Sequence, residues 1–166
     1  GTGFVDNHGW GSVLSLDGEK QYVELRRRSV DLGDATVSVW VKNNSGQPGE
    51  KVFSFSDGAD RYAYLVGTDP KSKQMEFVIS DGGKAKEQKI VAKALPYAKW
   101  THLAVTLENG CGSLYVDGKL AGTNPKMTLK WDAVVAPNLL SNTSKLFLGK
   151  GFTGLMDDFR IYVQPQ

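Results

Sequence analysis

The chain of 166 residues has the length of one domain, and 20 Lys and Arg residues oppose 18 Asp and Glu residues for a net charge of +2. This balance excludes the dense basic surface that nucleic-acid binding requires, and the short run Arg26–Arg28 has no aromatic residues interleaved with it. The single cysteine, Cys111, excludes an intrachain disulfide and a CxxC metal site, and no apolar stretch has the length of a membrane-spanning helix. We therefore expect one domain over residues 1–166 that neither binds nucleic acid nor spans a membrane.

Short runs with period-two alternation, broken by Gly and Asp-Gly, predict β-strands joined by tight turns. In Thr36–Lys42, three valines share one face, while Ser38, Trp40 and Lys42 share the other. No window combines helical periodicity with helix caps. In chain order the predicted strands are Val13–Asp17, Tyr22–Leu25, Thr36–Lys42, Lys51–Ser56, Tyr62–Val66, Met75–Ser80, Glu87–Val91, Trp100–Leu107, Gly112–Val116, Lys119–Gly122, Lys145–Leu148 and Gly154–Val163.

Two dipeptides define a meander in the middle of the chain. Asp117-Gly118 separates two strand candidates and suits a type I′ hairpin, which needs positive φ at both turn residues. Asn109-Gly110 joins the preceding pair of strands in the same way, so Trp100 to Thr123 is predicted to form three antiparallel strands. A dozen short strands with such turns predict an all-β fold of two antiparallel sheets, a β-sandwich or jelly roll.

Four segments carry a resemblance: Leu16-Asp17-Gly18 with Tyr22-Val23-Glu24-Leu25; Val37-Ser38-Val39-Trp40-Val41-Lys42; Trp100-Thr101-His102-Leu103-Ala104-Val105-Thr106 with Leu114-Tyr115-Val116-Asp117-Gly118-Lys119; and Gly154-Leu155-Met156-Asp157-Asp158-Phe159-Arg160-Ile161-Tyr162. In this order and spacing they resemble the bacterial laminin-G-like family of the concanavalin A-like lectin/glucanase superfamily. The resemblance runs from about Val13 to Tyr162.

The resemblance implies a concanavalin A-like jelly roll and a domain excised from a larger secreted or cell-surface protein. It further implies a non-catalytic accessory module that binds a polysaccharide or another glycan and contacts neighbouring domains of its parent protein. The alternative function is a structural or protein-adhesion module that packs beside a catalytic domain. Fold alone does not decide between the two, because one fold hosts many functions.

Two tryptophans outside the predicted strands are candidates for stacking on sugars. Trp131 lies between Lys130 and Asp132 in the long segment Thr123–Ser144, and Trp10 lies in a Gly-rich stretch near the N-terminus. Sugars present C–H faces to exposed indole rings, while nearby polar groups bind their hydroxyls. The alternative for each is a tryptophan that covers the edge of the core beneath its loop.

A second candidate surface for a glycan lies on one predicted strand. Tyr62 and Tyr64 alternate with apolar residues and therefore share a face, and Arg61 stands at the strand entry. The alternative is that both tyrosines pack between the sheets with their hydroxyls hydrogen-bonded.

Two further tryptophans lie within predicted strands. Trp40 and Trp100 are expected to belong to the core, because a large aromatic residue on an apolar strand face is usually buried. Truncating Trp40 is therefore expected to unfold the domain, whereas truncating Trp131 should leave the fold intact.

Among the acidic residues, Asp157 has an unusual predicted position, on a strand face that should be buried. Strict alternation places it on the same face as Phe159 and Ile161, which should point into the core, and a carboxylate there must be paired, hydrogen-bonded or metal-bound. The family resemblance implies calcium near the joined ends of the first and last strands, with Asp17 and Asp157 as ligands. The alternative is a carboxylate that accepts backbone N–H bonds at a strand end.

The sequence predicts no catalytic site. Related jelly-roll glycosidases place paired acids at alternating positions of one strand, whereas Glu24, Glu76, Glu87 and Glu108 are isolated in this sequence. His102 lies inside a predicted strand, with no nucleophile motif near it.

Overall fold

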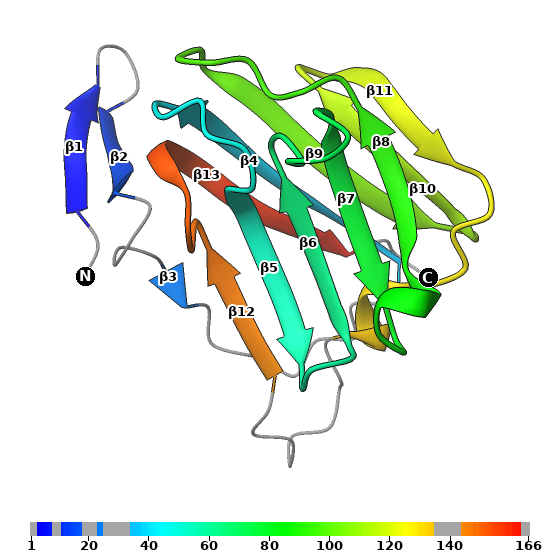
Figure 1. Cartoon of the computed structure of the whole chain (residues 1–166). Coiled ribbons are helices and arrows are strands. Elements are labelled where there is room, and N and C mark those ends of the chain that lie inside the picture. The colour runs from blue at the N-terminus through cyan, green and yellow to red at the C-terminus, as the bar shows by residue number, and fades with distance from the viewer. Residues whose placement is uncertain (1–2, 8–10, 18–22, 25–33, 135–143, 164–166) are drawn as a thin grey trace.

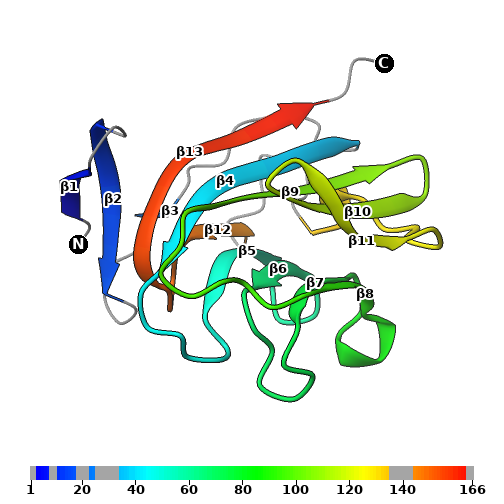
Figure 2. The same cartoon turned by 90° about the horizontal axis from the view of Figure 1, so that it is seen from above.

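The computed structural model describes residues 3–7, 11–17, 23–24, 34–134 and 144–163. These residues form two antiparallel sheets packed face to face, which confirms the predicted all-β sandwich (Figure 1). Figure 2 shows the larger sheet bending over the smaller one. The helices in the described ranges are two short 3₁₀ turns, η1 (Lys84–Lys86) and η2 (Trp131–Ala133), and none could cross a membrane.

The larger sheet has seven strands in the order β1-β2-β13-β4-β9-β10-β11. The consecutive strands β9, β10 and β11 form the predicted meander, and all four residues of its two turns, Asn109-Gly110 and Asp117-Gly118, have positive φ as predicted. The strand bounds are β1 (Gly3–Asn7), β2 (Gly11–Asp17), β4 (Ala35–Asn43), β9 (Thr101–Glu108), β10 (Cys111–Val116), β11 (Lys119–Asn124) and β13 (Thr153–Val163). Of these, β1 is a strand that the sequence patterns did not predict.

The smaller sheet has six strands in the order β3-β12-β5-β6-β7-β8. Its late strand β12 pairs with the early strands β3 and β5, so the chain passes between the sheets more than once, as in a jelly roll. The strand bounds are β3 (Val23–Glu24), β5 (Lys51–Asp57), β6 (Tyr62–Val66), β7 (Met75–Ser80), β8 (Gln88–Ala92) and β12 (Ser144–Leu148).

The core lies between the two sheets and is built by the period-two alternation of their strands. The larger sheet contributes mostly aliphatic side chains and the smaller sheet contributes phenylalanines. Fully buried members include Val37, Val39, Val41, Leu103, Val105, Leu107 and Met156 from the larger sheet and Phe53, Phe55, Leu65, Phe77, Ile79 and Ile90 from the smaller one. Because side chains fill the space between the sheets, the surfaces that a ligand could reach are the outer faces and the loops at the ends of the sandwich.

Candidate functional site

The predicted tyrosine pair lies on the outer face of the smaller sheet. Ala63 and Leu65 are fully buried, so the residues that alternate with them, Tyr62 and Tyr64, point away from the core and are partly exposed. Their ring centroids lie 6.0 Å apart with the planes 22° from parallel. Arg61 is exposed directly before them. The two tyrosines therefore share the outer face of the sheet, and packing between the sheets is excluded for them.

Neighbouring side chains already engage both tyrosines. The Lys51 Nζ lies 4.5 Å from the centroid of the Tyr64 ring, and the Tyr62 hydroxyl donates a hydrogen bond to Glu87 Oε2. Burial, together with the hydrogen bond to Glu87, raises the pKa of Tyr62 to about 12. Burial and the negative charge of Glu87 also raise the pKa of Tyr64. A sugar would have to displace Lys51 to stack on the ring face that it covers.

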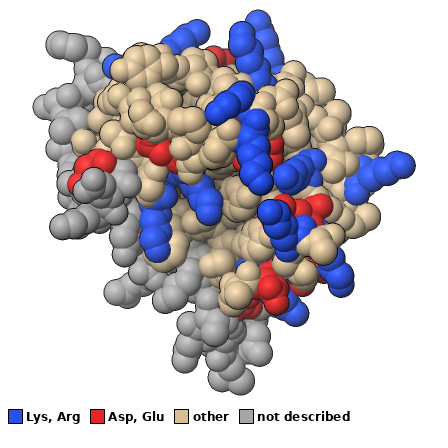
Figure 3. All heavy atoms as spheres, in the orientation of Figure 1, with Lys and Arg blue, Asp and Glu red and all other residues tan. Residues whose placement is uncertain are grey.

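Strand pairing also joins acids that are isolated in the sequence. The ammonium group of Lys89 lies 3.4 Å from Glu76 Oε1 and 3.9 Å from Glu87 Oε1, and Ser72 Oγ donates to Glu76 Oε2 at 2.6 Å. The two glutamates are isolated in the sequence but share one lysine in the fold, because β7 and β8 are neighbours in the sheet. Figure 3 shows lysines and carboxylates interspersed on this face.

Trp131 lies in the core and not on a binding surface. Its side chain is 0% exposed and contacts three phenylalanine rings, the nearest being that of Phe77, with 5.3 Å between ring centroids. Its Nε1 donates to the carbonyl oxygen of Ala35 on the opposite sheet at 2.9 Å. The turn η2 folds the indole ring inward between the sheets, so the prediction of a sugar platform at Trp131 is wrong.

Trp40 lies on an outer face of the sandwich, whereas the sequence-based prediction assigns it to the core. Val39 and Val41 are fully buried, so Trp40 points to the outer face of the larger sheet, where it is partly exposed. Its ring centroid lies 5.0 Å from that of His102 on the adjacent strand. Its assignment to the core is therefore wrong. Trp100 is also partly exposed, and Trp10 lies outside the described residues.

The two aspartates predicted to bind calcium are not brought together. A bulge in β13 interrupts the alternation, so Met156 points inward and Asp157 lies opposite Trp40 on the outer face. Asp17 pairs with Thr153, four residues along β13 from Asp157 and so roughly 13 Å away. Because calcium ligands lie at about 2.3–2.6 Å from the ion, the two carboxylates do not fit one site. Within the described ranges no group of three or more His, Cys, Asp and Glu could hold a metal.

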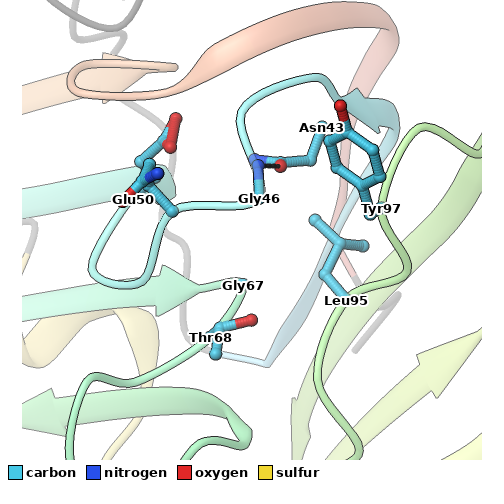
Figure 4. Close-up of a pocket in the computed structure, with 8 residues that line it drawn as sticks. Asn43, Gly46, Glu50, Gly67, Thr68, Leu95 and Tyr97 are labelled. Carbon is cyan, nitrogen blue, oxygen red and sulfur yellow. Dashed lines mark hydrogen bonds between the residues drawn. The ribbon is translucent and has the colours of Figure 1, made fainter.

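A pocket of about 90 Å³ lies at one end of the sandwich, where three loop segments meet. The segment after β4 and the segment between β8 and β9 supply walls that meet where Gly46 lies against Tyr97, and the residues after β6 supply the floor. Figure 4 shows Tyr97 and Leu95 on one side of this space and Glu50 and Thr68 on the other. The lining residues are Asn43, Gly46, Gln47, Glu50, Gly67, Thr68, Leu95 and Tyr97.

Backbone hydrogen bonds hold the three segments in register. Gly49 N donates to Thr68 O at 2.8 Å, and Gly67 N donates to Glu50 O at 3.2 Å. Leu95 N donates to Gly67 O at 2.9 Å, which fixes the second wall to the floor. Such bonds give the pocket its shape before any ligand arrives, which lowers the entropy cost of binding.

Asn43 anchors the wall that carries Tyr97. Its side-chain oxygen accepts a hydrogen bond from Gly46 N, and its carbonyl oxygen accepts one from Ala98 N, both at 2.7 Å. Gly46 has a φ of +66°, and a Cβ there would lie 3.3 Å from the Tyr97 ring, so glycine suits both the turn and the ring. Tyr97 is 65% exposed at the rim of the pocket. The pocket thus offers an aromatic ring beside amide and hydroxyl groups.

The sequence patterns did not predict this pocket. Its residues come from three stretches outside or at the ends of strands, and only the fold brings them together. The one available signal was Tyr97 itself, an aromatic residue after Pro96 in a segment without strand alternation.

Comparison with known proteins places the chain in its family. A laminin G family model, described as the concanavalin A-like lectin/glucanases superfamily, matches residues 17–165. A search of curated proteins finds no match.

Solved structures match the fold over nearly the whole chain. Domain 4 of the extracellular GH43 arabinanase AbnA of Geobacillus stearothermophilus, in complex with arabinotriose, has a TM-score of 0.73 at 20% identity, covering 98% of this chain and 75% of that one. The CBM40 of the Ruminococcus gnavus IT-sialidase, bound to α2,3 sialyllactose, has a TM-score of 0.68 at 15% identity, covering 92% and 91%. The leech intramolecular trans-sialidase has a TM-score of 0.70 at 15% identity, and the match covers 93% of this chain but 25% of the leech chain.

Proposed function

The chain belongs to the concanavalin A-like lectin/glucanases superfamily, and on this premise we propose that it is a non-catalytic carbohydrate-binding module whose glycan site is the pocket beside Tyr97. Such a module would hold its parent protein near a polysaccharide and raise the local concentration of substrate. The neighbours crystallised with arabinotriose and sialyllactose support a glycan ligand for this fold.

The observation that carries the proposal is the exposed Tyr97 ring at the rim of a hydrogen-bonded pocket. A tyrosine that is 65% exposed presents an apolar face to solvent, and the C–H face of a sugar covers such a ring well. Gln47 and Thr68 supply amide and hydroxyl groups for sugar hydroxyls in the same pocket. The volume of about 90 Å³ is small, so part of one sugar residue would enter the pocket while the rest of the glycan stays outside.

The tyrosines of β6 are the second candidate site. Tyr62 and Tyr64 share a surface, which favours the prediction, but Lys51 lies over Tyr64 and Glu87 accepts a hydrogen bond from the Tyr62 hydroxyl. Tyr97 makes a better platform, because it is more exposed and faces a cavity.

The acids of the smaller sheet support a role without catalysis. A glycosidase flanks the scissile bond with two carboxylates that can reach the sugar. Glu76 and Glu87 instead share an ion pair with Lys89, and each accepts a further hydrogen bond, from Ser72 and Tyr62 respectively. We also propose that the chain works outside the cell, as the extracellular arabinanase does.

The test is a glycan array followed by nuclear magnetic resonance titration of the purified chain. We expect dissociation constants in the micromolar to millimolar range, roughly −4 to −8 kcal/mol, as a single shallow site gives. Tyr97→Ala should lose binding without loss of folding. The matched control is Tyr162→Ala, which removes an exposed tyrosine from the larger sheet and should bind normally. If the wild type binds no glycan, a structural or adhesion module replaces this proposal; if Tyr62→Ala alone loses binding, the site is on β6.

A further inference from the structure

The charge of the Tyr97 pocket bears on the class of sugar that it accepts. Among the described residues that line the pocket, Glu50 is the only one with a formal charge. Its carboxylate accepts hydrogen bonds from Ser45 Oγ and from the backbone N of Thr153. These two donors hold the negative charge at a fixed place beside the pocket.

The lysines nearest in the sequence do not offset this charge from within the pocket. Lys51 follows Glu50, but its Nζ lies over the Tyr64 ring on the outer face of the smaller sheet. Lys42 precedes Asn43 and points to the outer face of the larger sheet. Lys93 and Lys99 flank the wall segment, are exposed, and are not among the described lining residues.

From this distribution we infer that the pocket selects uncharged sugar residues and rejects those that carry a carboxylate. This inference rests on the proposed function. Hydroxyl groups of a neutral sugar can donate to carbonyl and carboxylate oxygens and accept from amides, whereas an acidic sugar would place a second negative charge close to Glu50 with no cation between them. Like charges a few ångströms apart in a partly enclosed site repel strongly enough to weaken binding about tenfold.

The experiment uses pairs of sugars in which one member is neutral and the other carries a carboxylate. The purified chain is titrated by nuclear magnetic resonance with methyl galactoside against methyl galacturonide and with methyl glucoside against methyl glucuronide, and with lactose against 3′-sialyllactose. In each pair that binds, the neutral member should bind about tenfold more tightly. Raising the salt concentration should reduce the difference in affinity between the neutral and the acidic sugar, because salt screens charge repulsion.

A pair of variants tests whether the discrimination arises in the pocket. Gln47→Lys adds a cation at the rim and should remove or reverse the preference, while Gln74→Lys adds the same charge at an exposed residue outside the pocket and should leave it unchanged. Melting temperatures show that both variants fold. Equal or tighter binding of the acidic members by the wild type overturns the selectivity and leaves the proposed function standing. Binding of neither set, together with an empty glycan array, overturns the proposed function and the selectivity with it.

Discussion

Replacing Trp131 with alanine should bring the domain close to unfolding. The indole ring is fully buried, and it contacts Phe53, Phe55 and Phe77 with centroid distances of 5.3–6.2 Å. Truncating a core tryptophan costs about 3–5 kcal/mol. The loss of its Nε1 donor leaves the buried carbonyl oxygen of Ala35 without that partner, at a cost of about 1–3 kcal/mol more. This is a large part of the roughly 5–15 kcal/mol that stabilises a domain.

The assay is urea unfolding followed by circular dichroism, with the free energy of unfolding extrapolated to water. Trp131→Phe keeps an aromatic ring but loses the hydrogen-bond donor, so its free energy of unfolding should lie between those of the wild type and Trp131→Ala. Trp40→Ala is the matched control: it removes a partly exposed ring from an outer face, where water fills the space, and should cost only about 2 kcal/mol. If the free energy of unfolding of Trp131→Ala lies within about 1 kcal/mol of the wild-type value, Trp131 does not contribute to the core as described. The same holds if Trp131→Ala lowers this free energy by less than Trp40→Ala does.

Two further predictions concern the ionisation of Tyr62 and the close backbone approach at Gly154. Tyr62 should ionise only near pH 12 in an ultraviolet titration; because its pKa is raised from 10.0 to about 12, its contribution to stability is complete below pH 10 and is lost as the pH rises through 12. Glu87→Gln should lower that pKa, and an unchanged titration would contradict the assignment. Gly154→Ala should cost about 3 kcal/mol or more, because its Cβ would lie 2.0 Å from the carbonyl oxygen of Lys42. Gly118→Ala meets no atom within 4 Å and should cost about 1 kcal/mol for its positive φ alone; equal costs would argue against the close approach at Gly154.

The strands and turns could be predicted from the sequence because they depend on local patterns. Alternation in the run that became β4 and the Asp117-Gly118 pair specify a strand and a hairpin within a few residues. The same alternation already placed Trp40 on the face of Ser38 and Lys42, away from the valines, so its exposure could have been derived. The expectation that a tryptophan within a strand belongs to the core overrode the pattern.

The remaining errors concern features that only the tertiary fold decides. Trp131 is buried because the long connection from β11 to β12 returns to the sheets, and no local period encodes that path. Asp157 faces outward because Asp158, with a φ of 52°, forms part of a bulge that shifts the register by one residue. The pocket combines loop residues more than 50 positions apart, from Asn43 to Tyr97, so its geometry follows from the packing of the sandwich.

Mapping the bound glycan on the wild-type chain distinguishes the Tyr97 pocket from the other surfaces of the sandwich. Backbone amide resonances are recorded with increasing amounts of a neutral oligosaccharide that the glycan array identifies. We expect shifts concentrated at residues 43–50, 67–68 and 95–98, around Tyr97, with little change at Tyr62 and Tyr64. Shifts centred on β6, or on the outer face of the larger sheet around Trp40, would contradict it.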